Sequence, residues 1–243
     1  MALGFTLGRV DDTEAAAAVA DGTAAAREAE VSAIAALDEP TRRKLYEYVV
    51  RRPDPVGRDE AAAALGLARQ TAAFHLDRLA GESLLDVVYE RRSGRTGPGA
   101  GRPAKLYRRS ARQIAVSLPD RRYELAGRLL ARAVEESAAT GEPVRDVLHR
   151  RAHECGARLA ADGGRMELVP LLEGYGFEPR RDGEAVVLGN CPFHALARAH
   201  TETVCGMNQH LLRGVLDGLG DTGFEACLAP EPGRCCVRLE PAA

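Results

Sequence analysis

Five of the six cysteines of this 243-residue chain lie close together in its last quarter. They are Cys191, Cys205, Cys227, Cys235 and Cys236, whereas Cys155 stands alone upstream and is expected to be structural. Thiolates bind iron and zinc. The spacing is wide and lacks the C-x-x-C pair of a zinc ribbon. It favours an iron–sulfur cluster, because cluster ligands need only converge in space. Redox thiols and small buried side chains remain alternatives.

The predicted elements around these cysteines would bring three of the thiols together. Cys191 follows a predicted strand and precedes Pro192, a favoured first helical residue. We therefore expect its sulfur at a helix N-terminus, where the dipole lowers the thiol pKa. Cys205 is expected near the start of the next helix. Cys235 and Cys236 are expected to alternate across a strand, one inward and one outward. Possible additional ligands are His194, His200 and His210.

A second group of residues suited to binding chemistry is basic. From Arg91 to Arg112 every charged residue is positive, and a Gly- and Pro-rich loop lies among them, between strands predicted over 84–89 and 104–107. Two helices joined at Gly66 precede these strands. This order predicts a winged helix-turn-helix, in which a flexible positive loop lies beside an exposed helix and attracts DNA phosphates.

The second of these helices is predicted over 67–79, with Leu67, Phe74 and Leu79 facing the core. The opposite side carries polar candidates for DNA contact. Those at the helix start are expected to meet base edges, and those of the wing to follow phosphates or the minor groove. The predicted DNA-binding residues are Arg69, Gln70, Thr71, His75, Arg78, Arg95, Arg102 and Lys105. The expected partner is a double-stranded DNA operator.

Composition places limits on the remaining functions. The formal charge is −2 and 45% of residues are hydrophobic, so packed cores are possible and any DNA affinity must be local. No stretch is long and apolar enough to span a membrane, and residues 1–10 lack a signal core. We therefore expect a cytoplasmic protein with reduced thiols and no membrane partner.

The predicted fold class is α+β, with a winged helix-turn-helix, a helical dimerisation segment and a small α+β sensor domain. A helical stripe that includes Tyr123, Ala126 and Leu130 could pack on the same chain or on a second subunit. Two-fold symmetric operators favour a homodimer. The predicted domains are a disordered tail over 1–29, the DNA-binding domain over 30–112, the dimerisation segment over 113–163 and the cysteine-containing sensor domain over 164–243.

Two segments resemble a known family. The segment Gly-Arg-Pro-Ala-Lys-Leu-Tyr at 101–107 resembles the ArsR-like winged-helix repressors. Asn-Cys-Pro-Phe-His-Ala-Leu-Ala at 190–197, with a later and a terminal cysteine, resembles their SufR-type branch, which represses iron–sulfur assembly genes through its own bound cluster. The resemblance covers about residues 31–240. It implies a 4Fe–4S or 2Fe–2S cluster on Cys191, Cys205 and Cys235, with Cys236 as an alternative ligand.

Three functions follow from these observations. The first is a dimeric DNA-binding repressor that senses iron–sulfur or redox state. The second keeps the DNA-binding half but gives the C-terminal domain an apolar ligand pocket. That pocket would be lined by Leu168, Leu171, Leu172, Leu211, Leu212, Val215 and Leu219. The third is an enzyme with Cys191 as nucleophile and His194 as base, and we expect no such activity.

Overall fold

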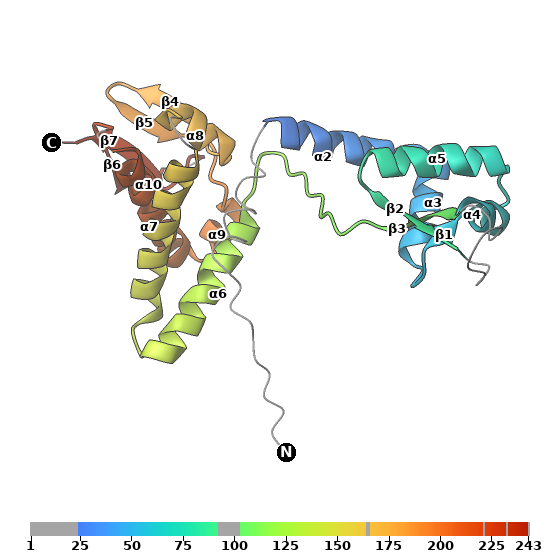
Figure 1. Ribbon diagram of the computed structural model, residues 1–243. Coiled ribbons are helices and arrows are strands. Elements are labelled where there is room, and N and C mark those ends of the chain that lie inside the picture. Colours follow the sequence, from blue (N-terminus) through green and yellow to red (C-terminus); the bar gives the residue numbers. More distant parts are fainter. Residues whose placement is uncertain (1–23, 92–102, 164–165, 221, 232, 243) are drawn as a thin grey trace, which may run out of the picture. The chain divides into compact units, whose positions relative to one another are not determined.

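The computed structural model describes residues 24–91, 103–163, 166–220, 222–231 and 233–242. They form two compact units, 25–116 and 117–243, and each has its own hydrophobic core (Figure 1). The first described helix begins at Ala24. Residues 24–29, which the sequence assigns to a disordered tail, are therefore helical. The rest of that predicted tail, 1–23, lies outside the described residues.

The N-terminal unit begins with four helices whose ends have local causes. Pro40 occupies the first turn of α3, and the Glu39 carboxylate caps that helix by accepting the backbone N–H groups of Thr41 and Arg42 at 2.9 and 2.6 Å. Gly66 ends α4 with a φ of +65°, which glycine adopts without strain. The helices are α2 (Ala24–Ala36), α3 (Pro40–Val50), α4 (Arg58–Leu65) and α5 (Arg69–Gly81).

An antiparallel sheet completes this unit and confirms the winged-helix architecture. It contains β1 (Val56–Gly57), β2 (Leu85–Glu90) and β3 (Ala104–Arg109), in the order β1-β3-β2. The β2–β3 hairpin pairs Leu85 with Arg109 at one end and Glu90 with Ala104 at the end next to the predicted wing loop. Residues 92–102 of that loop lie outside the described residues.

The C-terminal unit is an antiparallel sheet covered on one side by helices. Its strands have the order β4-β5-β7-β6. A turn at Gly183 and Glu184 joins β4 to β5, with Gly183 at a φ of +65°. The elements are α6 (Tyr123–Thr140), α7 (Val144–Asp162), α8 (Leu168–Gly174), β4 (Pro179–Asp182), β5 (Ala185–Leu188), α9 (His194–Ala199), α10 (Thr201–Leu219), β6 (Phe224–Leu228) and β7 (Val237–Pro241).

The helices of this unit form successive layers on the sheet. α10 packs on β6 and β7, α7 packs along α10, and α6 packs on α7 (Figure 1). Two glycines bring α7 and α10 into backbone contact. A Cβ added at Gly156 would lie 1.9 Å from the Leu211 carbonyl oxygen, and one added at Gly214 would lie 1.9 Å from that of His153. No larger residue fits at either position without separating the helices.

The predicted dimerisation segment, 113–163, contributes α6 and α7 to this same core. Ala126 of the predicted stripe is buried, as is Ala133 of the same helix, whereas Val134 is 59% exposed. The segment is therefore not a separate unit from residues 164–243, whatever its role in dimerisation. Among the described helices, none has the length and hydropathy needed to cross a membrane.

Candidate nucleic-acid interface and cysteine cluster

The exposed face of α5 differs in one respect from the predicted face. The buried residues are Ala72, Leu76 and Leu79, one turn apart along the helix. Phe74, predicted to face the core, is 66% exposed and lies on the opposite side with Gln70. The prediction was wrong at Phe74 because the buried position is taken by an alanine, whose small side chain gives a weak hydrophobic signal.

The polar residues of α5 are engaged to different degrees. Arg69 donates from Nη2 to Asp59 Oδ2 of α4 at 2.8 Å, and Arg78 Nη2 lies 2.6 Å from Glu82 Oε1. Gln70 and Thr71 are exposed, and neither side chain has a hydrogen-bond partner within the described part of the chain. Since Gln70 and Thr71 are at the N-terminal end of α5, they are the side chains most available to a base edge.

His75 is placed differently from the prediction. Its side chain is only 13% exposed, and Nδ1 lies 3.5 Å from Glu39 Oε2 of α3. Its ring meets the Phe74 ring edge-on at 5.2 Å between centroids. His75 therefore joins α5 to α3 instead of facing outward with Gln70. His75 is three positions from the buried Ala72, which places it at the edge of the buried stripe.

Lys105 of β3 is also not a free cation. Its Nζ donates to Asp77 Oδ1 of α5 at 2.6 Å, and the buried Tyr107 hydroxyl donates to the same oxygen at 2.5 Å. Burial acts to raise the pKa of Asp77, but these two hydrogen bonds outweigh it and hold that pKa below its usual value. The network joins the wing strand to the exposed helix. Asp77 is the one acidic residue of α5, and no local sequence pattern indicates its pairing with Lys105.

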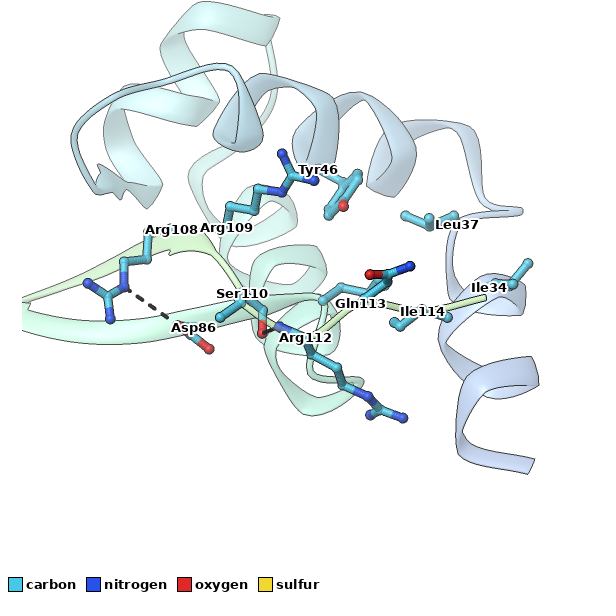
Figure 2. Close-up of a pocket in the computed structure, with 12 residues that line it drawn as sticks. Ile34, Leu37, Tyr46, Asp86, Arg108, Arg109, Ser110, Arg112, Gln113 and Ile114 are labelled. Atoms are coloured by element: carbon cyan, nitrogen blue, oxygen red, sulfur yellow. Dashed lines mark hydrogen bonds and ion pairs between the residues drawn. The ribbon is translucent and has the colours of Figure 1, made fainter. Parts of the chain in front are cut away.

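Only some of the remaining basic residues are among those the structure describes. Arg95 and Arg102 lie outside the described residues. Arg108, Arg109 and Arg112 lie at or beyond the end of the β2–β3 hairpin farthest from its loop. There they line a cavity of about 750 Å³ between α2, α3 and the chain leaving β3, and Arg108 pairs with Asp86 at 3.7 Å (Figure 2). Figure 2 shows Arg109 turned toward Tyr46.

The four predicted cluster ligands lie together in the C-terminal unit. These thiols are near enough to affect one another's pKa: Cys235 acts on Cys191, and Cys236 acts on both Cys235 and Cys205. They come from the segment after β5, from α10 and from the turn before β7. All except Cys236 are buried. The predicted convergence of three chain segments is therefore present in the fold.

Two local expectations about these cysteines were wrong. α9 begins at His194 with Phe193 at its N-cap, so Cys191 precedes the helix rather than starting it. The hydrogen bond to Cys235 and burial raise the pKa of Cys191, opposite to the expected lowering. Cys235 and Cys236 precede β7 and do not alternate across it, so both thiols reach the cluster of sulfurs.

Asn190 fixes the position of Cys191. Its side chain, 8% exposed, donates to the carbonyl oxygens of Asp120 and Gly176 at 3.1 and 2.6 Å, and accepts from Arg121 Nη1 at 2.5 Å. Arg121 also donates to the Cys191 carbonyl oxygen at 3.3 Å. Since three chain segments meet at Asn190, it holds the cysteine segment against the start of α6. The Asn-Cys pair was noticed in the sequence, but this role was not predicted.

The other candidate ligands lie elsewhere or have other partners. His194 and His200 are exposed, and His210 stacks on His149 at 4.2 Å between ring centroids. Cys155 is buried in α7, as expected. Across the described ranges, no three His, Cys, Asp or Glu side chains already surround a single metal position. A cluster would therefore require these side chains to rearrange.

The alternative apolar pocket is filled by its own side chains. Leu171, Leu172, Leu211, Leu212 and Val215 are all buried in the packed core. They surround a cavity of about 10 Å³, which has room for at most one water molecule. The structure therefore offers no ready space for an apolar ligand at this place.

Comparison with known proteins bears on the N-terminal unit. A family model described as a helix-turn-helix domain matches residues 37–88, which include α3, α4, α5 and the first part of β2. Residues 37–88 are therefore similar to a helix-turn-helix domain, and their helices have the fold expected of one. Together with the wing strands, this domain supports a DNA-binding transcriptional regulator of the winged-helix type. No curated protein and no solved structure matches the chain.

Proposed function

We propose that this protein is a transcriptional repressor whose C-terminal unit senses iron–sulfur or redox state through its cysteines. The observation that carries the proposal is the meeting of Cys191, Cys205, Cys235 and Cys236 from three chain segments. Four thiols are the usual ligand set of 2Fe–2S and 4Fe–4S clusters. Buried free thiols alone would not need to lie close to one another.

The surroundings of the thiols suit a cluster. The Asn208 amide, 1% exposed, donates from Nδ2 to Cys235 Sγ at 3.2 Å, and its Oδ1 has no hydrogen-bond partner among the described residues. Hydrogen bonds to the ligating sulfurs tune the reduction potential of a cluster. A bound cluster would supply a group whose charge, or whose presence, changes with iron and oxidant levels.

The cysteine segment is connected to the chain that enters α6. Arg121 bonds to Asn190 and to Cys191, the Arg122 N–H donates to the Pro192 carbonyl oxygen at 3.0 Å, and the Ala195 N–H donates to the Tyr123 hydroxyl at 3.3 Å. Residues 117–122 directly follow the winged-helix unit in the chain. A displacement of Cys191 would therefore be passed to the residues that join the sensor to the DNA-binding unit.

We further propose that the repressor acts as a homodimer on double-stranded DNA, with α6 at the interface. Tyr123 and Val134 are apolar and exposed on α6, while its other face packs on α7. A dimer reads two half-sites about 34–36 Å apart, so a shift of a few Å at α6 changes the fit to an operator. Sedimentation equilibrium of the wild type and of Val134→Glu tests this interface, and an unchanged monomeric mass in both would refute it.

The cluster is tested by anaerobic purification followed by iron, sulfide and visible-absorption measurements. We expect wild type and Cys155→Ser to contain iron and sulfide, and Cys191→Ser to contain neither. DNA binding of the wild type should differ between the loaded and the iron-free protein, and Cys191→Ser should lose that difference. Wild type that contains no iron and sulfide yet binds its operator normally would refute the cluster.

A second outcome of the same experiment has a structural basis. Cys191 and Cys235 are near neighbours, so a two-electron oxidant could join them in a disulfide with release of two protons. Iron-free protein that loses two titratable thiols on oxidation, and with them its DNA affinity, would replace the cluster with a thiol switch. Cys227→Ser is the matched control, because Cys227 lies on β6 and is not among the four neighbouring thiols.

A further inference from the structure

Phe74 is an exposed phenyl ring on the helix that carries the predicted base contacts. It is 66% exposed, whereas the apolar residues of the opposite face of α5, Ala72, Leu76 and Leu79, are fully buried. Its ring meets the His75 ring edge-on at 5.2 Å between centroids, and His75 Nδ1 lies 3.5 Å from Glu39 Oε2. The Phe74 ring is therefore largely open to solvent.

Helix geometry puts Phe74 beside Gln70 at the centre of the exposed face. With about 100° per residue, Gln70 and Phe74 lie about 160° and about 200° around the helix from the buried Ala72. They are the second and sixth residues of the 13-residue α5, in the half of a recognition helix that enters the major groove. Asp77, the next residue along this face, is already held by Lys105 and Tyr107.

We propose that Phe74 contacts the C5-methyl group of a thymine in the operator and so helps to determine its sequence. This inference rests on the proposed DNA-binding function. In the major groove the thymine methyl is the apolar feature of the base edges, and phenylalanine is among the side chains that recognise it. An exposed ring gains by covering a methyl group, since both lose contact with water.

The spacing on α5 also sets where this thymine lies. Gln70 and Phe74 are one turn apart, a rise of about 6 Å, which corresponds to about two base steps of about 3.4 Å. The amide of Gln70 is suited to the N6 and N7 atoms of adenine. Each half-site should therefore contain a thymine within about two base pairs of an adenine, and this pair is read by neighbouring side chains of one helix.

The test uses duplexes that the full-length wild type itself selects from a random pool. Each thymine of the selected site is replaced in turn by deoxyuridine, which removes only the methyl group. We expect one position per half-site at which wild type loses about fourfold in affinity, because burial of one methyl-sized group is worth about 0.8 kcal/mol. Phe74→Ala should bind all the uridine-substituted duplexes as it binds the parent, and Phe74→Leu should keep part of the sensitivity.

Val31→Ala is the matched control, because Val31 is also exposed and apolar but lies on α2. It should retain the full response to uridine. The inference is overturned if Phe74→Ala retains the wild-type uridine response, or if it weakens selected and random duplexes equally. Failure of the proposed function gives a different result, since the wild type would then enrich no sequence from the pool. Unchanged circular dichroism establishes that each variant is folded.

Discussion

Replacement of Asp77 by alanine should loosen the wing from α5. Two interactions are lost. The Lys105 pair is half exposed, with 40% and 53% of the two side chains accessible, and such pairs are worth about 0–1 kcal/mol. The Tyr107 hydroxyl, on a residue 2% exposed, donates to a charged acceptor, a bond worth about 1.5–3 kcal/mol. Asp77 is itself partly solvated, so we take the lower end of both ranges. We expect the free energy of unfolding of the N-terminal unit to fall by about 2 kcal/mol.

Hydrogen exchange of the β3 amides in the full chain measures this loss within the unit concerned. A loss of about 2 kcal/mol corresponds to about 30-fold faster exchange. Lys105→Ala should change the rates by less than fivefold, a factor that corresponds to about 1 kcal/mol. Tyr107→Phe should account for most of the Asp77 effect, and the double variant Asp77→Ala with Tyr107→Phe should lose little more than Asp77→Ala. Additive effects of the two substitutions would refute the shared hydrogen bond.

Three further predictions concern other parts of the molecule. Gly156→Ala and Gly214→Ala should each lower the melting temperature of the C-terminal unit, because the new Cβ lies 1.9 Å from a backbone carbonyl oxygen. Gly127→Ala on α6 is the control and should leave the melting temperature unchanged or raise it, because no atom lies within 4 Å of the new Cβ. Equal effects at the three positions would contradict the close contact between the helices. Burial lowers the pKa of His149 and His210, so the unfolded chain binds protons more readily than the folded one. The C-terminal unit should therefore lose stability as pH falls from about 7 to about 5, and His210→Phe should lose less in thermal unfolding. A wild-type melting temperature that stays constant over this range would refute this explanation. Gln70→Ala should weaken the binding free energy for selected DNA by about 1–3 kcal/mol and change binding to random DNA little, as measured by competition binding. Equal losses on both kinds of DNA would count against base reading by Gln70.

The elements that could be predicted from the sequence are those with strong local signals. Gly66 separates two helices as expected, because glycine adopts its positive φ without strain. The two strands of the wing were also predicted, since apolar and β-branched residues flank a loop of glycines and proline. Tertiary partners were harder to predict. The neutralisation of Lys105 depends on Asp77, 28 positions earlier, and no local pattern indicates that pair.

The errors at the candidate sites have similar causes. Phe74 was assigned to the core because its hydrophobicity exceeds that of Ala72, yet the helical period places the alanine inside. Pro192 indicated a helix start, and α9 begins two residues later at His194. The convergence of Cys191, Cys205 and Cys235 was predicted from their segments. Two other features of the site depend on packing between distant segments and could not be predicted. They are the proximity of the thiols to one another and the hydrogen bonds through which Asn190 and Arg121 position Cys191.

The division of the chain near residue 117 has a consequence for how such regulators arise. Each unit completes its own core and its own sheet, and no strand pairing or helix is cut at that point in the chain. A genetic recombination event at this junction would therefore leave both halves able to fold. The same winged helix could be inherited with a different C-terminal unit, and the same cysteine-bearing unit with a different winged helix. Regulators built in this way can change the signal they detect and the sequence they bind in separate evolutionary steps.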